Sequence, residues 1–270
     1  MNEKPDPPHP GNRAFTRVDL LALMASSALL LFIVLPALGR VTGKTAVAQC
    51  AANLEQYDMA LQIYGGENQD NLPSIGFPVP GAWAWDVPLG YTAWLTNTGV
   101  KWTSFYCPGT SGRFTEQDNW LWWNIYVPAG HRVLGYASTL PSIGSMDQTV
   151  GTYSFSTNIN STLNMQRVNL SGTNLPVIPA SRVLVADATL TYGNGVPPPA
   201  GPALNAAKLT YDWVDNFITF NLKPGISAHL NGLIPLGGNV GMLDGHVEWR
   251  DFTNMLPRAG GVNGEAFFYW

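Results

Sequence analysis

Charged residues are scarce in this sequence of 270 residues. They make up 12% of the chain, which is about half of the roughly 25% found in typical soluble domains. The net charge is −4 and no basic stripe is present, which argues against nucleic acid as a partner. Common enzyme motifs are lacking too, namely the phosphate loop, the nucleophile elbow, the zinc-protease helix and the dinucleotide fingerprint. The sequence therefore gives no indication of an enzyme or of a bound cofactor.

One long segment carries no charge at all. From Leu20 to Gly39 the only polar side chains are two serines, and a helix of that length just spans a hydrocarbon core of about 30 Å. A cleaved secretory signal is the alternative, but the apolar part of such a signal is usually only about 7–15 residues long. We therefore predict a retained transmembrane helix over residues 15–39.

Basic residues near this segment indicate its orientation. Slightly more of them precede the segment than follow it, which favours a cytoplasmic N-terminus and an extracytoplasmic remainder. The residues counted are Lys4, Arg13, Arg17, Arg40 and Lys44.

The helix is predicted to continue beyond the apolar segment with a different character. Apolar residues recur every three or four positions, which predicts an amphipathic stem over residues 40–66. Asn53 and Asp58 fall on other faces of this helix, and Gly65-Gly66 supplies a stop signal. The apolar stripe consists of Val47, Cys50, Leu54, Tyr57, Leu61 and Tyr64.

Residues 14–19 read "AFTRVD" and directly precede the apolar segment. This stretch resembles the processing site of type IV prepilins and type II secretion pseudopilins. The resemblance implies a leader of residues 1–14, prepilin peptidase cleavage between Ala14 and Phe15, and N-methylation of Phe15. It also implies that Asp19 pairs with the new amino group of Phe15 during subunit assembly. The alternative is that Asp19 rests in the lipid headgroup layer beside Arg17, satisfied by water.

The remainder of the chain, residues 67–270, alternates short strand patterns with loops rich in proline and glycine. Strands are predicted in "VKWTSFYCPG" (100–109), "HRVLGYAST" (131–139) and "RVLVADAT" (182–189), whereas the polar tract 154–179 is predicted to be irregular. Together with the long helix, these patterns predict an α+β fold. The resemblance implies its pilin-like version, in which a long N-terminal helix packs on a mostly antiparallel β-sheet head with long loops.

A hairpin is predicted near the C-terminus, in "VGMLDGHVEW" (240–249). Two alternating runs flank an Asp-Gly pair, which is typical of a two-residue hairpin loop because glycine tolerates the positive φ of such a turn. This register pairs Met242 with Val247, and Val240 with Trp249, and predicts these four residues as the core side.

The same stretch resembles the C-terminal signature of a large pseudopilin-like family of Planctomycetes and Verrucomicrobia, in which a histidine precedes an Asp-Gly-His-Val run. The residues that match are His229, Asp244, Gly245 and His246. Imidazole and carboxylate groups suit zinc and other transition metals, which makes His229, Asp244 and His246 candidate ligands. Asp187 is a candidate fourth member. Because their spacing matches no strong metal motif, we adopt the simpler interpretation that Asp244 caps its own turn and that no metal is bound.

The chain has two cysteines, Cys50 on the apolar stripe of the stem and Cys107 at a strand-to-turn boundary. An extracytoplasmic head permits a disulfide between them, and we predict that this disulfide joins stem to head. The alternative is a pair of buried free thiols. No pattern pairs either cysteine with a histidine, so a catalytic role is not indicated for them.

Tryptophan is abundant, with ten residues in the chain and the densest group in "NWLWWNIY" (119–126). We expect these rings to fill the core or a subunit interface. The alternative is an aromatic platform that binds a sugar.

The resemblance implies a structural, non-enzymatic subunit held in the bacterial inner membrane by one helix, with a periplasmic head. Such a subunit assembles through that helix into a type II secretion pseudopilus or a related filament. The implied partners are the prepilin peptidase, other pilin or pseudopilin subunits, inner-membrane components of the secretion system and the lipid bilayer. Two alternatives remain: a membrane-anchored module that binds glycans through its tryptophan-rich loops, and an anchored metallohydrolase that uses His229, Asp244 and His246.

Overall fold

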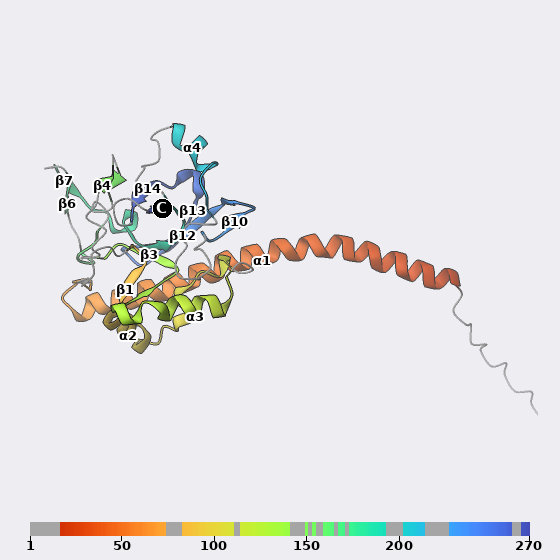
Figure 1. Cartoon of the computed structure of the whole chain (residues 1–270), viewed down its shortest axis with the longest axis horizontal. Coiled ribbons are helices and arrows are strands. Elements are labelled where there is room, and N and C mark those ends of the chain that lie inside the picture. Colours follow the sequence, from red (N-terminus) through yellow and green to blue (C-terminus); the bar gives the residue numbers. More distant parts are fainter. Residues whose placement is uncertain are drawn as a thin grey trace, which may run out of the picture. The chain divides into compact units, whose positions relative to one another are not determined.

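Figure 1 shows the computed structural model of the whole chain. It describes residues 17–73, 83–110, 114–140, 149–150, 153–154, 159–164, 167–170, 173–192, 202–213, 227–260 and 266–270. Side chains are described in these ranges except at 31–43, 149–150, 153–154, 167–170, 173–175 and 192. The chain divides into two compact units, Met1–Lys44 and Thr45–Trp270.

The helices belong mostly to the second unit. The first of them, α1 (Arg17–Glu67), begins in the first unit and ends in the second. The others are α2 (Leu89–Asn97), α3 (Glu116–Ile125) and α4 (Pro202–Lys208). Single 3-10 turns lie at Trp102–Phe105, Pro108–Thr110, Val127–Ala129, Pro179–Ser181 and Phe252–Asn254.

The strands are short, and their pairs are antiparallel throughout the described residues. One sheet has the order β13-β12-β8-β3, formed by β13 (Val247–Asp251), β12 (Gly237–Met242), β8 (Val183–Asp187) and β3 (Tyr136–Ser138). A second has the order β14-β15-β9, formed by β14 (Pro257–Ala259), β15 (Ala266–Tyr269) and β9 (Leu190–Tyr192). The remaining pairs are β1 (Asp86–Pro88) with β2 (His131–Val133), β4 (Thr149–Val150) with β5 (Tyr153–Ser154), β6 (Arg167–Leu170) with β7 (Thr173–Pro176), and β10 (Leu230–Asn231) with β11 (Ile234–Pro235). The predicted α+β class with antiparallel sheets is confirmed.

The second half of α1 forms part of the core of the second unit. The predicted stripe is confirmed for Cys50, Leu54, Tyr57 and Leu61, whose side chains are 0% exposed. The hydroxyl groups of Tyr57 and Ser138 of β3 lie 2.9 Å apart and form a hydrogen bond. This half of the helix therefore packs on the four-stranded sheet.

Other elements cover further faces of the same helix half. Tyr64 contacts Trp94 of α2 edge to face, with ring centroids 5.0 Å apart, and Asn53 donates to the carbonyl of Tyr106 at 3.4 Å. Figure 1 shows α2 and α3 beside this part of α1. Asn53 and Asp58, which the sequence places on other faces of the helix, are buried as well. Because neighbouring elements pack on several faces of this helix, residues outside the apolar stripe are buried too.

The first part of α1 belongs to the first unit. Asp19 lies in the first turn of the helix, where the positive end of the helix dipole stabilises an acid. None of the helices, as far as their residues are described, combines the length and apolar composition that a membrane crossing requires. The predicted cleavage site, Ala14 and Phe15, lies outside the described residues, as do the side chains of 31–43.

The predicted hairpin forms, but its register is shifted by one residue. Val240 pairs with Glu248 and Asn239 pairs with Trp249, because the loop contains three residues in place of two. Gly245 takes φ 92° at the last of these positions, as in a type I turn followed by a glycine bulge. The shift places Asn239 on the same face as Trp249, which matters for the site described below.

Two strand predictions are confirmed and two local predictions are wrong. The segments 131–139 and 182–189 contain β2, β3 and β8. The segment 100–109 forms 3-10 turns instead of a strand, and the tract 154–179 contains the hairpin of β6 and β7. Aromatic residues in 100–109 pack as single anchors in the core, so their strand-like composition reflects burial and not pairing.

Candidate metal centre

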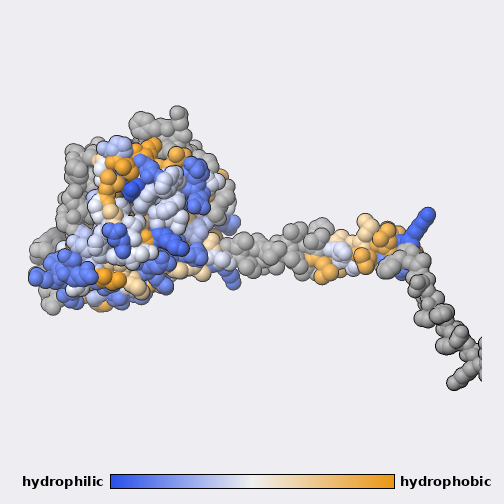
Figure 2. Space-filling model, turned by 90° about the horizontal axis from the view of Figure 1, so that it is seen from below, coloured by the Kyte–Doolittle hydropathy of each residue, from blue (hydrophilic) through white to orange (hydrophobic). Residues whose placement is uncertain are grey.

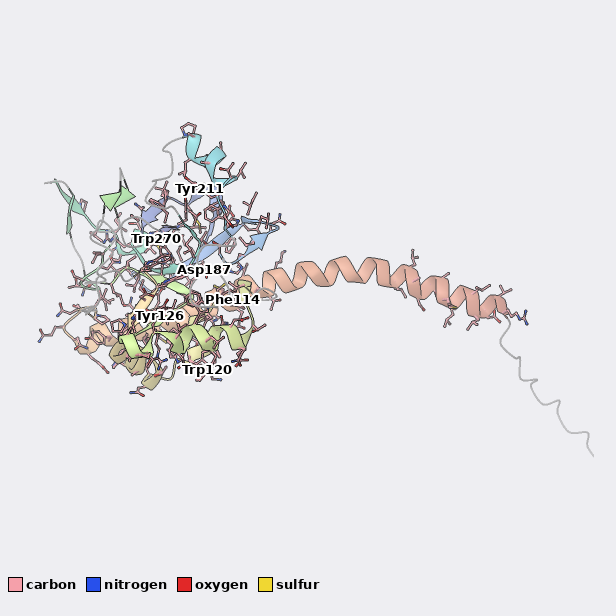
Figure 3. All side chains as sticks on the ribbon, viewed as in Figure 1. Phe114, Trp120, Tyr126, Asp187, Tyr211 and Trp270 are labelled. Atoms are coloured by element: carbon pink, nitrogen blue, oxygen red, sulfur yellow. The ribbon has the colours of Figure 1, made fainter. Side chains whose placement is uncertain are left out.

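Four side chains from distant parts of the sequence meet inside the second unit. Cys50 lies on α1, Cys107 between two 3-10 turns, Asp187 at the end of β8, and His229 just before β10. Their sulfur, oxygen and nitrogen atoms all lie within 4.8 Å of one another, and all four residues are buried. Figure 3 shows Asp187 in the interior of this unit.

Cys50 joins the group because it sits on the buried face of α1. Its thiol donates a hydrogen bond of 2.8 Å to Oδ1 of Asp187. Its sulfur also lies 3.7 Å from the hydroxyl of Tyr136 on the neighbouring strand β3. Helix and sheet are thus linked through this thiol.

Cys107 begins the turn Cys107-Pro108-Gly109. The backbone N–H of Gly109 points back and donates to Sγ of Cys107 at 3.3 Å. The sulfur lies 3.2 Å from Nε2 of His229. A side chain at Gly109 is excluded because a Cβ atom there would lie 2.5 Å from Nδ1 of His229. The turn therefore brings the sulfur and the imidazole into contact.

A backbone hydrogen bond fixes the side chain of Asp187, and an unusual backbone conformation orients that of His229. The carboxylate of Asp187 accepts the backbone N–H of Asn239 at 2.7 Å, which the observed register of β12 makes possible. His229 has φ 53°, a left-handed conformation that is uncommon for residues other than glycine. In this conformation its Nε2 lies 3.4 Å from Oδ2 of Asp187, and its ring packs against the edge of Trp249.

Burial and mutual contact alter the acidity of these groups. Burial raises the pKa of the Cys107 thiol well above its usual value, and the neighbouring Cys50 and Asp187 raise it further. Burial lowers the pKa of His229, but hydrogen bonds and charge from Asp187 and Cys50 outweigh this effect and raise its pKa to about 9. A thiol with a raised pKa is a poor nucleophile, so the arrangement does not favour covalent catalysis by Cys107.

A polar hollow reaches the cluster from outside. Its volume is about 550 Å³, and it is bordered by Cys107 and by polar side chains that include Gln49, Asn53, Lys101 and Glu116. A second, mainly apolar cavity also includes Cys107 in its wall. Cys107 therefore borders both spaces.

The structure brings the two cysteines together, as the predicted disulfide requires. Both thiols are unbridged, so the disulfide stays a prediction. No sequence pattern pairs either cysteine with a histidine, yet His229 contacts Cys107 in the folded chain. This contact forms because the fold places the turn at 107–109 beside residue 229, and no local sequence pattern indicates it.

The predicted metal ligands are only partly brought together. His229 and Asp187 belong to the cluster, but Asp244 and His246 lie on the exposed hairpin turn. There Nδ1 of His246 contacts Oδ1 of Asp244 at 2.5 Å, and the backbone N–H of His246 donates to the same oxygen at 3.3 Å. Asp244 thus caps its own turn, and the grouping of these two residues with His229 is corrected. An acid that ends an apolar strand, as in "VLVAD", was the available signal for Asp187.

The other predicted sites have different surroundings. Asp19 is exposed in the first turn of α1. Gly245 of the signature supplies the left-handed position of the hairpin turn. Neither lies in the buried cluster.

The tryptophans lie mostly in the core, as expected. Trp120 is the tryptophan with a large exposed fraction, 45%, and Figure 3 shows it at the edge of the unit. Trp94, Trp102 and Trp249 are partly buried. The buried ones are Trp83, Trp85, Trp122, Trp123, Trp213 and Trp270. The expectation that these rings fill the core therefore holds for most of them, and the sugar-binding platform stays an alternative.

In comparisons with known proteins, no family model, curated protein or solved structure matches the chain.

Proposed function

We propose that this chain is a pseudopilin-like structural subunit, anchored in a membrane and assembled through the N-terminal part of α1. The observation that carries the proposal is a run of apolar side chains on that part of the helix. Seven large apolar residues between Val18 and Leu30 have exposed fractions of 56% to 72%. Figure 2 shows apolar side chains on this part of the helix.

Such a surface is unfavourable in water. Each exposed Å² of apolar surface costs about 25 cal/mol relative to burial, and a large contiguous apolar patch typically marks a membrane or protein interface. The sequence continues uncharged to Gly39. A lipid bilayer and the equivalent helices of neighbouring subunits are both apolar and long enough to bury this segment.

The position of Asp19 supports assembly through this helix. An acid at the edge of an apolar helix is costly in a membrane unless it has a partner. Cleavage before Phe15 creates an amino group four residues away along the chain. In a filament, the amino group of one subunit would neutralise Asp19 of its neighbour.

The composition of the second unit also supports a subunit role. It buries most of its aromatic residues in two hydrophobic clusters, the larger of which includes the second half of α1, and so has the content of a self-sufficient folded head. The first part of α1 shows no comparable burial in its described side chains. The two parts of one helix thus have different partners, as a filament subunit requires.

Mass spectrometry of the mature chain from a membrane fraction tests the proposal. We expect a chain that begins at Phe15 and carries one added methyl group on its amine. In a strain that lacks the prepilin peptidase, the same chain should retain Met1 to Ala14. Retention of Met1 to Ala14 in both strains would contradict the proposal.

A further inference from the structure

We propose that Cys50, Cys107, Asp187 and His229 bind one Zn²⁺ ion that joins α1 to the β-sheet. The four donor groups comprise two thiols, one carboxylate and one imidazole nitrogen, and they converge from four separate segments of the chain. This inference concerns the folded head and is independent of the proposed assembly role.

The donor set selects the metal. Zn²⁺ is bound in structural sites by four ligands drawn mainly from cysteine and histidine, with carboxylates as further donors. Mg²⁺ and Ca²⁺ prefer oxygen ligands alone, so two sulfur donors disfavour them. Thiolate ligands with imidazole favour zinc among the common divalent ions of the cell.

The observed distances fit a tetrahedral ion. Ligand atoms about 2.0–2.3 Å from zinc, at tetrahedral angles, are separated by about 3.3–3.8 Å. Nε2 of His229 lies 3.2 Å from Sγ of Cys107 and 3.4 Å from Oδ2 of Asp187. All the donor atoms lie within 4.8 Å of one another, so small side-chain rotations bring the set to this geometry.

Proton release accompanies binding. In the structure the thiol of Cys50 donates to Asp187 at 2.8 Å. When Zn²⁺ binds, each thiol and the Nε2 position of His229 give up their protons to solvent, and the two sulfur atoms and the ring nitrogen form bonds to the metal. The Cys50–Asp187 hydrogen bond is thereby replaced by two metal–ligand bonds, and no redox change is required.

Hydrogen bonds around the donors already orient them. The N–H of Gly109 points at the sulfur of Cys107, and the N–H of Asn239 holds the carboxylate of Asp187. Such outer contacts typically fix metal ligands and tune their affinity. Trp249 packs on the ring of His229 and keeps it in place.

The site is closed, which indicates a structural role. Four protein donors fill the coordination of zinc, whereas a catalytic zinc keeps a position for water or substrate. All four residues are at most 6% exposed. The polar hollow beside Cys107 provides the route by which the ion enters. Binding would fasten the second half of α1 to β8 and to the segment before β10.

The metal content of the full chain tests the inference. The full chain is purified without chelator, and its zinc is measured together with its free thiols after denaturation. We expect one zinc and two free thiols per chain. Two free thiols without a metal, or a chain lighter by the two thiol hydrogens because of a disulfide, would overturn the inference.

A second measurement uses Co²⁺ as the probe in the full wild-type chain. After removal of zinc under reducing conditions, Co²⁺ should give the strong visible bands of a tetrahedral site and a thiolate-to-cobalt band in the near ultraviolet. Chelation of the native metal should lower the melting temperature of the head by about 10 °C or more, since metal binding adds to folding free energy. A Co²⁺ spectrum of an octahedral ion without sulfur bands would contradict the inference.

Matched variants separate loss of the site from loss of the fold. His229→Asn keeps a residue that tolerates the left-handed backbone, and Asp187→Asn keeps the size of the side chain. Both should lose stoichiometric Zn²⁺ binding, while His246→Asn and Asp244→Asn, made at the exposed turn, should keep it. Equal zinc content in all four variants would show that the cluster does not hold the ion.

Discussion

At the scale of single residues, a buried carboxyl group gives the clearest pH response. Asp86 is 8% exposed, and burial raises its pKa to about 7, although the N–H of Trp83 donates to it at 2.7 Å and opposes the shift. In the unfolded chain the pKa is about 3.9. The folded state therefore binds more protons between these two values, and its stability falls as pH rises through this range.

We expect Asp86→Asn to remove this pH dependence. The wild type should lose about 4 kcal/mol relative to the variant between pH 4 and pH 8, since each pKa unit corresponds to about 1.36 kcal/mol. Denaturant unfolding of both chains across this range measures the difference. Glu55→Gln, at an exposed position of α1, is the control and should run parallel to the wild type. Parallel curves for Asp86→Asn as well would show that this carboxyl does not carry the effect.

At the scale of elements, α1 approaches the sheet closely where Asp58 meets Gly241. Asp58 is 0% exposed, and both of its carboxyl oxygens lie where a side chain on Gly241 would need to be. Burial raises the pKa of Asp58 well above its usual range, and the charge of Asp244 raises it further. The helix can approach β12 this closely only because residue 241 has no Cβ atom.

We expect Gly241→Ala to destabilise the head by about 1–3 kcal/mol, the usual cost of overpacking a close contact. Asp58→Ala should relieve most of this cost in the double variant, because it removes the group that clashes. Chemical unfolding of the two single variants and the double variant gives the coupling energy. Gly66→Ala, on the same helix with nothing within 4 Å of its added Cβ atom, should not destabilise. Simple additivity of the two changes would contradict the contact.

At the scale of the whole molecule, the question is what covers the apolar part of α1. If Asp19 pairs with the amino group of Phe15 in a neighbouring subunit, Asp19→Ala should lower the assembled fraction about tenfold or more, since about 1.4 kcal/mol corresponds to a factor of ten. The assembled fraction is measured by cross-linking in membranes. The head should unfold at the same temperature as the wild type, because Asp19 lies outside the second unit. Glu55→Ala is the control. Normal assembly of Asp19→Ala would count against the pairing.

Local sequence patterns predict some elements of this fold correctly and fail for others. The stripe from Cys50 to Leu61 and the strand β8 were predictable because each has a strong hydrophobic pattern that its neighbours reinforce. The hairpin at Gly245 was predictable as a turn, but its register was not, because two- and three-residue loops share the same Asp-Gly signal. The segment 100–109 was mispredicted because its buried aromatic residues anchor turns instead of pairing as a strand.

The sequence by itself determined the α+β class, the long helix with its buried stripe and the turn at Asp244 and Gly245, since these follow from patterns within a few residues of the chain. Only the tertiary structure decided the candidate metal centre. The spacing of the four ligands along the chain matches no metal-binding motif. The local sequence around each of Cys50, Cys107, Asp187 and His229 is that of an ordinary core segment or turn. They meet because α1 packs on β8, because the turn at Gly109 has room for the ring of His229, and because the register of β12 fixes the carboxylate of Asp187. Contacts between residues far apart in sequence depend on how elements pack, and no local pattern encodes that packing.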